Sequence, residues 1–333
     1  MLRLPPFTYL APQSIAEAVR LKAEHGADAM FVAGGSDVYA GMKRGQFEPK
    51  VLVALHGIEG LASVTGDAAR GFSIGACVTL ARLQEHPQIR AHFPALAKAA
   101  GLAGSPQLRQ TGTIGGNVCL DTRCNYYNQT FEWRKAIAFC MKKDGDICRV
   151  APGSAKCVAV SSSDTAPVLC SLGAQVRLVG PLGERKIPIQ DLYRDDGMYY
   201  LTKQADEILT HIDLPPPDGL RCAYWKLRRR GSFDFSVLGV AVALRSEGET
   251  VREARIVLGG VGSQPRAATA AADLLVGRRL TPEVIDAAAE AAAKLAKPLD
   301  NTDMAHIYRK KVARVYAKRA LEEIAGLPIE EGP

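Results

Sequence analysis

The stretch LRQTGTIGGN, residues 108–117, contains the most informative glycine motif of this 333-residue chain. Its Gly115–Gly116 pair follows the hydroxyl residue Thr113 and precedes Asn117. A shorter motif of the same kind, AGGSD at residues 33–37, comes directly after an apolar segment. Glycine lets a backbone approach a ligand closely and turn its N–H groups toward a phosphate. The two motifs together therefore predict a site for a diphosphate-containing ligand.

Neither motif has the pattern of the common nucleotide signatures. The chain contains no G-x-G-x-x-G at these positions and no G-x-x-x-x-G-K-[ST], so neither a Rossmann site nor a P-loop is supported. A single Gly-Gly pair is also explained as a plain turn. We expect both motifs to follow an apolar strand and to carry a hydroxyl donor, which favours the diphosphate interpretation.

Apolar periodicity around these motifs predicts helices and strands in mixed order. Ser14 followed by Glu17 is a capping box that begins a helix. Short apolar runs predict strands at residues 29–33, 51–55 and 175–179, and a strand pair at 236–244 and 254–258. Further helices are expected around residues 94–103, after Thr281 with Pro282 at the first position, and over residues 304–324.

The triplet Pro215–Pro217 is the clearest linker in the chain and predicts a domain boundary. A chain of 333 residues exceeds one ordinary hydrophobic core, so more than one domain is expected. We expect a first domain over residues 1–217 and a smaller C-terminal domain over residues 218–333. The last predicted helix is expected to bury one apolar face, made of Ile307, Val312, Val315, Tyr316 and Leu321.

Composition and charge exclude several classes of protein. Hydrophobic residues make up 47% and charged residues 23%, the balance of a globular rather than a disordered chain. The longest apolar run, residues 237–244, is far short of the roughly 18 residues that span a bilayer, so no membrane association is expected. The net charge of +7 is spread along the chain, which favours a solvated surface over a nucleic-acid site. The N-terminal residues lack the apolar core of a signal peptide, so we expect a cytoplasmic protein.

Cysteines gather in a segment where the regular periodicity stops, at about residues 118–160. Of the eight cysteines in the chain, five lie there: Cys119, Cys124, Cys140, Cys148 and Cys157. A segment of roughly 40 irregular residues is longer than an ordinary loop and indicates either a functional insertion or disorder. Because a cytoplasmic chain does not rely on disulfides, clustered thiols predict metal or redox chemistry.

The last four of these thiols are candidate metal ligands, with separations of 16, 8 and 9 residues. Structural zinc sites usually include cysteines roughly two to four residues apart, and the chain has no C-x-x-C. The wide spacing favours a loop that wraps one [4Fe–4S] cluster, with zinc and free thiols as alternatives. Three other cysteines lie in apolar stretches and are expected to be buried and inert: Cys77, Cys170 and Cys222.

These segments together resemble the FAD-binding subunits of the molybdenum hydroxylases, a family that includes the flavin domains of xanthine and carbon monoxide dehydrogenases. The resemblance covers nearly the whole chain. It rests on the two glycine motifs and on later segments at residues 207–210 (EILT), 224–226 (YWK), 308–309 (YR) and 318–321 (KRAL). It implies an α+β fold in which two subdomains enclose FAD, followed by a smaller C-terminal α+β domain.

The resemblance also implies which residues bind FAD. They are Phe31, Val32, Ala33, Gly34, Gly35, Ser36, Asp37, Val38, Ala103, Thr113, Ile114, Gly115, Gly116, Asn117, Asp164, Leu209 and Lys226. Taken alone, Asp164 is also explained as a helix N-cap and Lys226 as a surface lysine. No catalytic residue is expected, because the sequence has no catalytic triad or paired-carboxylate motif and a flavin carries its own redox chemistry.

The position of the thiol segment sharpens the resemblance. A cysteine-bearing insertion just before the Ser-x-x-Asp segment at residues 161–164 is similar to that of the β subunits of 4-hydroxybenzoyl-CoA reductases. This implies a [4Fe–4S] cluster bound by Cys124, Cys140, Cys148 and Cys157. It also implies partner subunits that carry molybdenum and a [2Fe–2S] cluster, in a dimer of heterotrimers. Electrons would pass from reduced ferredoxin through the cluster and FAD to these partners, which convert 4-hydroxybenzoyl-CoA to benzoyl-CoA.

The insertion is rich in basic and aromatic residues. The basic residues either attract an acidic carrier such as ferredoxin or offset the anionic cluster, and they are Arg123, Arg134, Lys135, Lys142, Lys143, Arg149 and Lys156. The aromatic residues are expected to shield the cluster from water, and they are Tyr126, Tyr127, Phe131, Trp133 and Phe139. Two other functions stay open: a flavin subunit of another molybdenum hydroxylase, and an FAD-binding assembly module with a zinc-stabilised docking loop.

Overall fold

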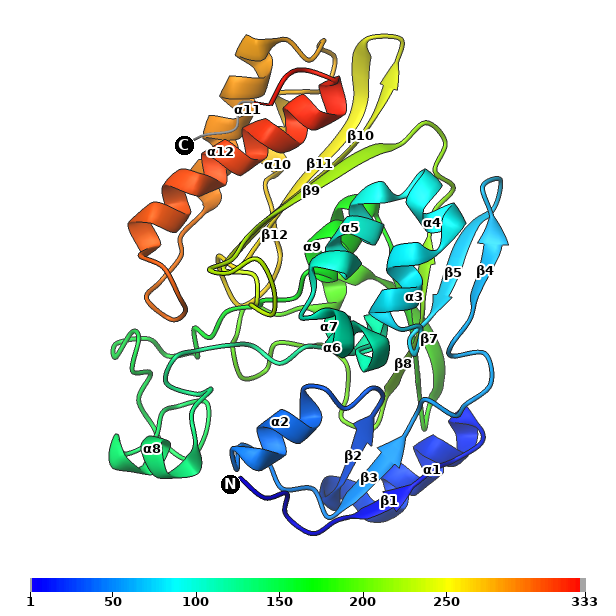
Figure 1. The fold of residues 1–333 in the computed structure, drawn as a ribbon, viewed down its shortest axis with the longest axis vertical. Coiled ribbons are helices and arrows are strands. Elements are labelled where there is room, and N and C mark those ends of the chain that lie inside the picture. Colours follow the sequence, from blue (N-terminus) through cyan, green and yellow to red (C-terminus); the bar gives the residue numbers. More distant parts are fainter. Residues whose placement is uncertain (1, 330–333) are drawn as a thin grey trace.

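A computed structural model describes residues 2–329, which fold into mixed helix and strand structure on three β-sheets (Figure 1). The predicted α+β class is therefore confirmed. No helix within residues 2–329 is long and apolar enough to cross a bilayer.

The first sheet is parallel, with strand order β1-β3-β2. Its strands are β1 (Thr8–Leu10), β2 (Ala29–Val32) and β3 (Val51–Ala54), and its helices are α1 (Ile15–His25) and α2 (Val38–Lys43). A 3₁₀ turn at Gly26–Asp28 follows α1. The predicted capping box is confirmed, because Ser14 Oγ accepts a hydrogen bond from Glu17 N at 3.1 Å.

The second sheet is antiparallel, with strand order β4-β5-β8-β6-β7. Its strands are β4 (Val64–Asp67), β5 (Gly71–Gly75), β6 (Gln175–Gly180), β7 (Gly183–Pro188) and β8 (Ile208–Leu214). The accompanying helices are α3 (Leu80–Glu85), α4 (Pro87–His92), α5 (Pro94–Leu102), α6 (Pro106–Thr111), α7 (Ile114–Val118) and α9 (Thr165–Leu172), with a 3₁₀ turn at Ile189–Leu192.

The third sheet is also antiparallel, with strand order β12-β11-β10-β9. Its strands are β9 (Arg221–Leu227), β10 (Leu238–Glu247), β11 (Thr250–Gly259) and β12 (Arg266–Ala267). The C-terminal helices are α10 (Thr269–Asp273), α11 (Pro282–Leu295) and α12 (His306–Ala325). The predicted pairing of residues 236–244 with 254–258 is confirmed by the β10–β11 register, in which Val240 faces Leu258.

The core of the molecule is layered. Helices α5 and α9 pack against β9, β10 and β11, so they lie between the second and third sheets. Helices α11 and α12 cover the other face of the third sheet (Figure 1). Buried side chains of the second sheet, such as Ile212, and of the third sheet, such as Tyr224 and Ala241, belong to one core cluster with Leu169 of α9.

The buried face of α12 agrees only in part with the predicted one, because Val312 and Leu321 are buried and Tyr316 is partly buried, as expected. Ile307 and Val315 are 61% and 42% exposed, whereas the small residues Ala313, Ala317 and Ala320 are fully buried. The apolar pattern of this helix misleads because alanine side chains let the helix approach α11 closely. The face is therefore set by the close packing of small residues as well as by large apolar residues such as Leu321.

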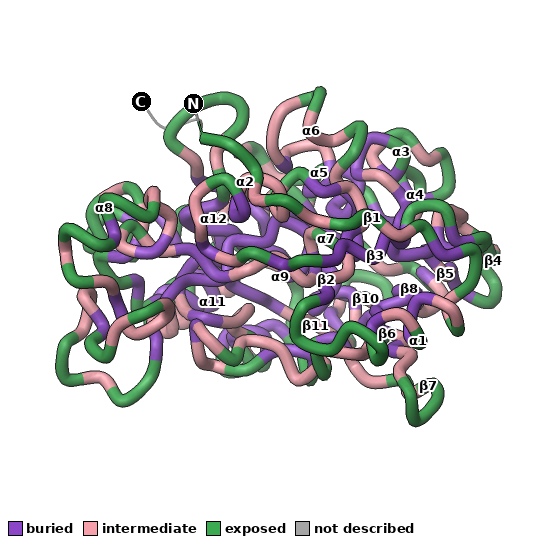
Figure 2. Tube along the Cα trace, turned by 90° about the horizontal axis from the view of Figure 1, so that it is seen from below, coloured by how far each residue is buried: buried purple, intermediate pink, exposed green. Residues whose placement is uncertain are grey.

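Between α7 and α9 the chain follows an irregular course in which α8 (Phe131–Ala136) is the one helix. This segment forms one end of the molecule (Figure 2). Exposed residues lie on its outer turns, and buried residues lie where it meets the rest of the chain. All four candidate metal-ligand cysteines lie in this segment.

Candidate functional site

The first glycine motif connects β2 to α2. Phe31 and Val32 end the strand, residues 33–37 form the connection, and Val38 begins the helix. Gly35 has a φ of +71°, in the left-handed region that other residues rarely adopt. A Cβ at Gly34 would lie 1.7 Å from the carbonyl oxygen of Thr111, so only glycine fits there.

The second glycine motif does not follow a strand, which corrects the prediction. Helix α6 precedes it, and Ile114–Asn117 lie within the short helix α7. The reason is local, because Thr113 is extended and its Oγ1 accepts a hydrogen bond from Gly116 N at 3.1 Å, as an N-cap does. Gly115 is again required by packing, since its Cβ would lie 2.6 Å from that of Ala76.

The structure brings the two motifs into contact. The added Cβ of Gly34 would meet both Thr111 O and, at 3.1 Å, Gly112 N. Ser36 Oγ lies 3.5 Å from the position that a Cβ of Gly112 would take. Two segments about eighty residues apart in sequence therefore form one glycine-lined surface. At Gly116, an added Cβ would meet only Thr113 Oγ1, so a gap remains there that a side chain would fill.

Asn117 ties the second motif to the start of α9. Its Oδ1 accepts hydrogen bonds from Ser163 Oγ at 2.8 Å, Thr165 N at 3.0 Å and Thr165 Oγ1 at 2.7 Å. Asp164 lies between these two donors in the sequence, so Asn117 fixes the backbone that carries Asp164. The Asp164 side chain does not cap the helix, which excludes the N-cap explanation for it.

Asp164 and Lys226 form a buried ion pair, with Oδ1 and Nζ 2.9 Å apart and side chains 4% and 1% exposed. Lys226 is therefore not a surface lysine. The Tyr224 hydroxyl donates to Asp164 at 3.2 Å, and Lys226 donates to the Leu102 carbonyl, next to Ala103, at 2.8 Å. Burial raises the pKa of Asp164 and lowers the pKa of Lys226, while each charge opposes the shift of the other.

Leu209 lies on β8 and is 5% exposed, within the apolar core. Its neighbour Thr210 accepts a hydrogen bond from Ala76 N at 2.8 Å, and Ala76 O accepts one from Gly115 N at 2.9 Å. The strand that carries Leu209 therefore supports the second glycine motif from behind. Four predicted FAD-binding residues lie outside the two motifs, namely Ala103, Asp164, Leu209 and Lys226. The elements that carry them contact the motifs or contact each other.

Four thiols line a single cavity in the irregular segment. Its volume is about 10 Å³, and its walls are Cys124, Tyr126, Tyr127, Cys140, Met141, Lys142, Cys148, Arg149, Val150, Cys157 and Ala159. The four candidate metal ligands thus line one cavity and none of them forms a disulfide, while their role as metal ligands stays a prediction. The remaining cysteines, Cys77, Cys119, Cys170 and Cys222, lie away from the cavity walls.

The donor set of this cavity suits a thiolate-bound metal group. Burial raises the pKa of Cys124 to about 11 and also raises that of Cys157, where Lys142 partly opposes the shift. Metal binding to these thiols must therefore release protons. Among residues 2–329, no three His, Cys, Asp or Glu side chains converge closely enough to hold a single metal ion.

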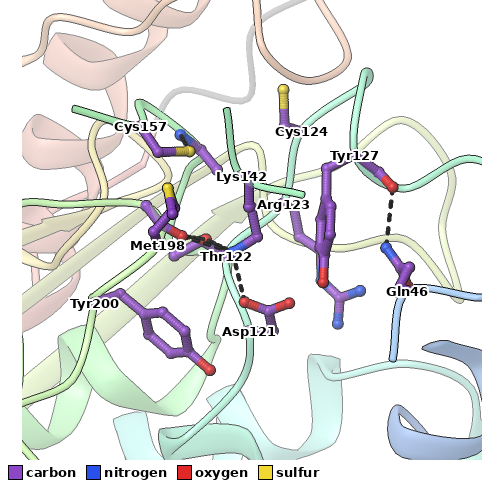
Figure 3. Close-up of polar contacts among 12 residues, drawn as sticks. Gln46, Asp121, Thr122, Arg123, Cys124, Tyr127, Lys142, Cys157, Met198 and Tyr200 are labelled. Carbon is purple, nitrogen blue, oxygen red and sulfur yellow. Dashed lines mark hydrogen bonds and ion pairs between the residues drawn. The ribbon is translucent and has the colours of Figure 1, made fainter. Parts of the chain in front are cut away.

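The thiol segment is anchored to the region of the first glycine motif. Arg123, adjacent to Cys124, forms an ion pair with Asp37 of that motif. Arg134, whose side chain is 1% exposed, donates from Nη2 to the Gly45 carbonyl at 2.6 Å. Gln46 Nε2 donates to the Tyr127 carbonyl at 3.0 Å (Figure 3). The cavity and the glycine loops are therefore held in a fixed relation.

The C-terminal part of the chain anchors the same segment from another side. The Asn301 carbonyl accepts from Asn125 N at 2.9 Å, and Asn301 Nδ2 donates to the Val158 carbonyl at 2.6 Å. The two residues that Asn301 contacts directly follow candidate ligands, because Asn125 comes after Cys124 and Val158 comes after Cys157. Asn301 thus links the two ends of the thiol segment.

The expected roles of the basic and aromatic residues need correction. Arg123, Arg134 and Lys142 have side chains no more than 9% exposed, so these three are not available to attract an external carrier. Lys143 and Lys156 are 40% and 48% exposed. Of the aromatic residues, Tyr126 and Tyr127 line the cavity as expected, whereas Phe131 and Trp133 are 44% and 40% exposed and lie outside its wall. The Arg123–Asp37 pair was not predicted, since its partners are 86 positions apart and no local pattern signals it.

Two family profiles match nearly the whole chain. Residues 5–217 match the "FAD binding domain in molybdopterin dehydrogenase". Residues 223–324 match the "CO dehydrogenase flavoprotein C-terminal domain".

Individual relatives agree with these matches. The carbon monoxide dehydrogenase medium chain of Hydrogenophaga pseudoflava is 29% identical over 95% of this chain and 96% of its own length. The aldehyde oxidoreductase FAD-binding subunit of Escherichia coli is 31% identical over 94% and 98%. A solved structure of the Hydrogenophaga pseudoflava carbon monoxide dehydrogenase, in a form that lacks the Mo-pyranopterin moiety, superposes with a TM-score of 0.79 at 28% identity, covering 97% of this chain and 99% of that one. The chain therefore belongs to the family of FAD-binding subunits of the molybdenum hydroxylases.

Proposed function

We propose that this flavin subunit also carries a [4Fe–4S] cluster and transfers electrons between that cluster and FAD. The observation that carries the proposal is that one cavity is lined by all four candidate ligands, Cys124, Cys140, Cys148 and Cys157. The anchoring of that cavity to Asp37 of the first glycine motif supports a role coupled to the flavin. Flavin and cluster would supply the redox chemistry, while the protein supplies position, electrostatics and exclusion of water.

The proposed FAD site comprises the two glycine motifs and the elements behind them. The gap at Gly116 and the left-handed Gly35 suit a backbone that approaches a diphosphate. We assign Asp164, Lys226 and Asn117 to holding the site in shape. Asp164 and Lys226 form an ion pair, Asn117 accepts a hydrogen bond from Ser163 beside Asp164, and Lys226 donates to the Leu102 carbonyl. We propose residues 1–217 as the FAD-binding domain and residues 218–333 as the C-terminal domain, and the family matches end and begin close to this boundary.

For the complete enzyme we propose a 4-hydroxybenzoyl-CoA reductase type. In it, reduced ferredoxin delivers electrons to this subunit, and partner subunits with [2Fe–2S] and molybdenum centres use them to convert 4-hydroxybenzoyl-CoA to benzoyl-CoA. The thiol cavity supports this type, because it provides an entry point for single electrons besides the flavin. The test is benzoyl-CoA formation by the purified complex with reduced ferredoxin, and a complex that oxidises an aldehyde or carbon monoxide instead would contradict it.

The cluster itself is tested by the metal content of anaerobically purified protein. We expect about four iron, four acid-labile sulfide and one FAD per chain. The Cys140→Ser variant should lose most of its iron and keep its FAD, because Cys140 lines the thiol cavity and not the glycine surface. Cys119→Ser is the matched control, since Cys119 lies in the same segment but not in the cavity wall. Zinc without sulfide in the wild type would overturn the electron-transfer role of the insertion and leave a flavin subunit with a structural metal loop.

A further inference from the structure

Lys142 places a buried positive charge at the wall of the thiol cavity. Its Nζ lies 2.7 Å from Asp121 Oδ1, 2.7 Å from Thr122 Oγ1 and 2.6 Å from the Gly197 carbonyl (Figure 3). The side chain is 6% exposed. Three oxygen partners hold the ammonium group in one position.

Two aromatic rings enclose the same ammonium group. Nζ lies 4.7 Å from the ring centroid of Tyr127 and 5.3 Å from that of Tyr200. Rings at this distance attract a cation and exclude water from it. Since dissolved ions screen buried charges far less than exposed ones, the field of Lys142 reaches the cavity largely unscreened.

The segment that binds Lys142 also contacts a thiol of the cavity. Gly197 N donates to the Cys157 carbonyl at 2.8 Å. A Cβ at Gly197 would lie 2.7 Å from Cys157 Sγ. The Gly197 carbonyl accepts from Lys142, so the ammonium group and the Cys157 sulfur both lie against this one residue.

We propose that the fixed charge of Lys142 raises the reduction potential of the iron–sulfur group bound by the four cysteines, and that Asp121 limits this increase. The inference rests on the proposed function. Reduction adds a negative charge to the cluster, and a nearby buried cation stabilises the reduced form more than the oxidised form. Asp121 acts in the opposite direction, because its carboxylate lies 2.7 Å from the same ammonium group.

The proposal is tested by reductive titration of the full-length protein in its complex, with the cluster followed by EPR. Lys142→Met should shift the cluster potential downward. Lys143→Met removes the same charge one residue away, but its side chain is 40% exposed and pairs with Asp144. The control variant should leave the potential unchanged. If the role of Lys142 is purely structural, Lys142→Met should lose iron, but the clusters that remain should keep the wild-type reduction potential.

Asp121→Asn provides the opposite charge change at the same place. It should shift the potential upward, and the double variant Lys142→Met/Asp121→Asn should return close to the wild type. An iron-loaded Lys142→Met protein with the wild-type potential overturns this inference alone. If Lys142→Met loses its cluster, Asp121→Asn decides, because an upward shift supports the inference and no shift overturns it. A wild type without iron overturns the proposed function and this inference together.

Discussion

The glycine loops and the thiol segment are neighbours in this structure, yet they are held in place by different means. The loops are fixed by close backbone approach, so that a Cβ at Gly34 or Gly115 would meet a neighbour at 1.7 or 2.6 Å. The thiol segment has little regular structure and is fixed by buried polar side chains such as Arg123, Arg134 and Lys142.

This difference separates two ways of building a cofactor site. Backbone approach is independent of charge, so the contact between the two glycine loops should change little with pH or salt. Behind the loops, however, the site also depends on the buried Asp164–Lys226 ion pair. The thiol segment depends on ion pairs and on hydrogen bonds to carbonyl groups, whose contribution varies with desolvation and with protonation. The following predictions test the comparison, from the largest expected effect to the smallest.

Lys226→Met should have the largest effect, because it leaves Asp164 as a buried charge without its cation. Removing one partner of such a pair costs about 3–5 kcal/mol. We expect this loss in the free energy of unfolding measured with urea, together with loss of FAD. The double variant Lys226→Met/Asp164→Asn should recover much of the stability. A stable Lys226→Met protein that fails only to bind FAD would instead make Lys226 a direct flavin contact.

Gly34→Ala should be the next most disruptive change, since its Cβ would overlap the Thr111 carbonyl. Overpacking against a rigid backbone costs about 3 kcal/mol. We expect a lower melting temperature and a reduced FAD content. Gly57→Ala is the control, because no atom lies within 4 Å of its added Cβ. Wild-type FAD binding by Gly34→Ala would show that the two loops need not touch.

Arg134→Met should loosen the thiol segment without affecting the glycine loops. It leaves the partly buried Gly45 carbonyl without its donor, which costs about 1 kcal/mol. We expect faster limited proteolysis within residues 124–157 and a lower iron content, with FAD retained. Lys135→Met removes an exposed charge from the same helix and should behave as the wild type. Equal loss of FAD and iron would mean that the two regions fold as one unit.

Asp195→Asn should have the smallest effect and should depend on pH. Asp195 pairs with Lys156 of the thiol segment at 2.6 Å and with Arg266 at 2.8 Å. Burial tends to raise the pKa of Asp195, but these two cations outweigh it and hold the pKa below its usual 3.8. The carboxylate therefore stabilises the fold above pH 3.8, and this contribution is lost as the pH falls through the lower folded pKa.

Because all three side chains are partly exposed, the expected difference at pH 7 is under about 1 kcal/mol. Urea unfolding of the wild type and Asp195→Asn between pH 7 and pH 3 measures it. The difference should shrink toward the acidic end. A constant difference across that range would mean that the ion pair does not contribute.

Short-range sequence patterns determined much of this molecule. The Ser14–Glu17 capping box, the β10–β11 pair and the helix after Thr281 depend on residues a few positions apart, and all three formed as predicted. The four cysteines that line one cavity could also be singled out from the sequence, because their chemistry marks them even where no periodicity does, but their role as metal ligands stays a prediction.

Tertiary structure alone decided how the long polar side chains are used. Lysine and arginine usually lie on the surface, but the side chains of Lys226, Lys142 and Arg123 are buried. Each forms an ion pair with an aspartate, and these partners are Asp164, Asp121 and Asp37. The buried face of α12 was likewise decided by packing. The physical reason is the same in each case. Helix caps and hairpins depend on neighbours along the chain, whereas the burial of a charge or a small side chain depends on which distant segment folds against it.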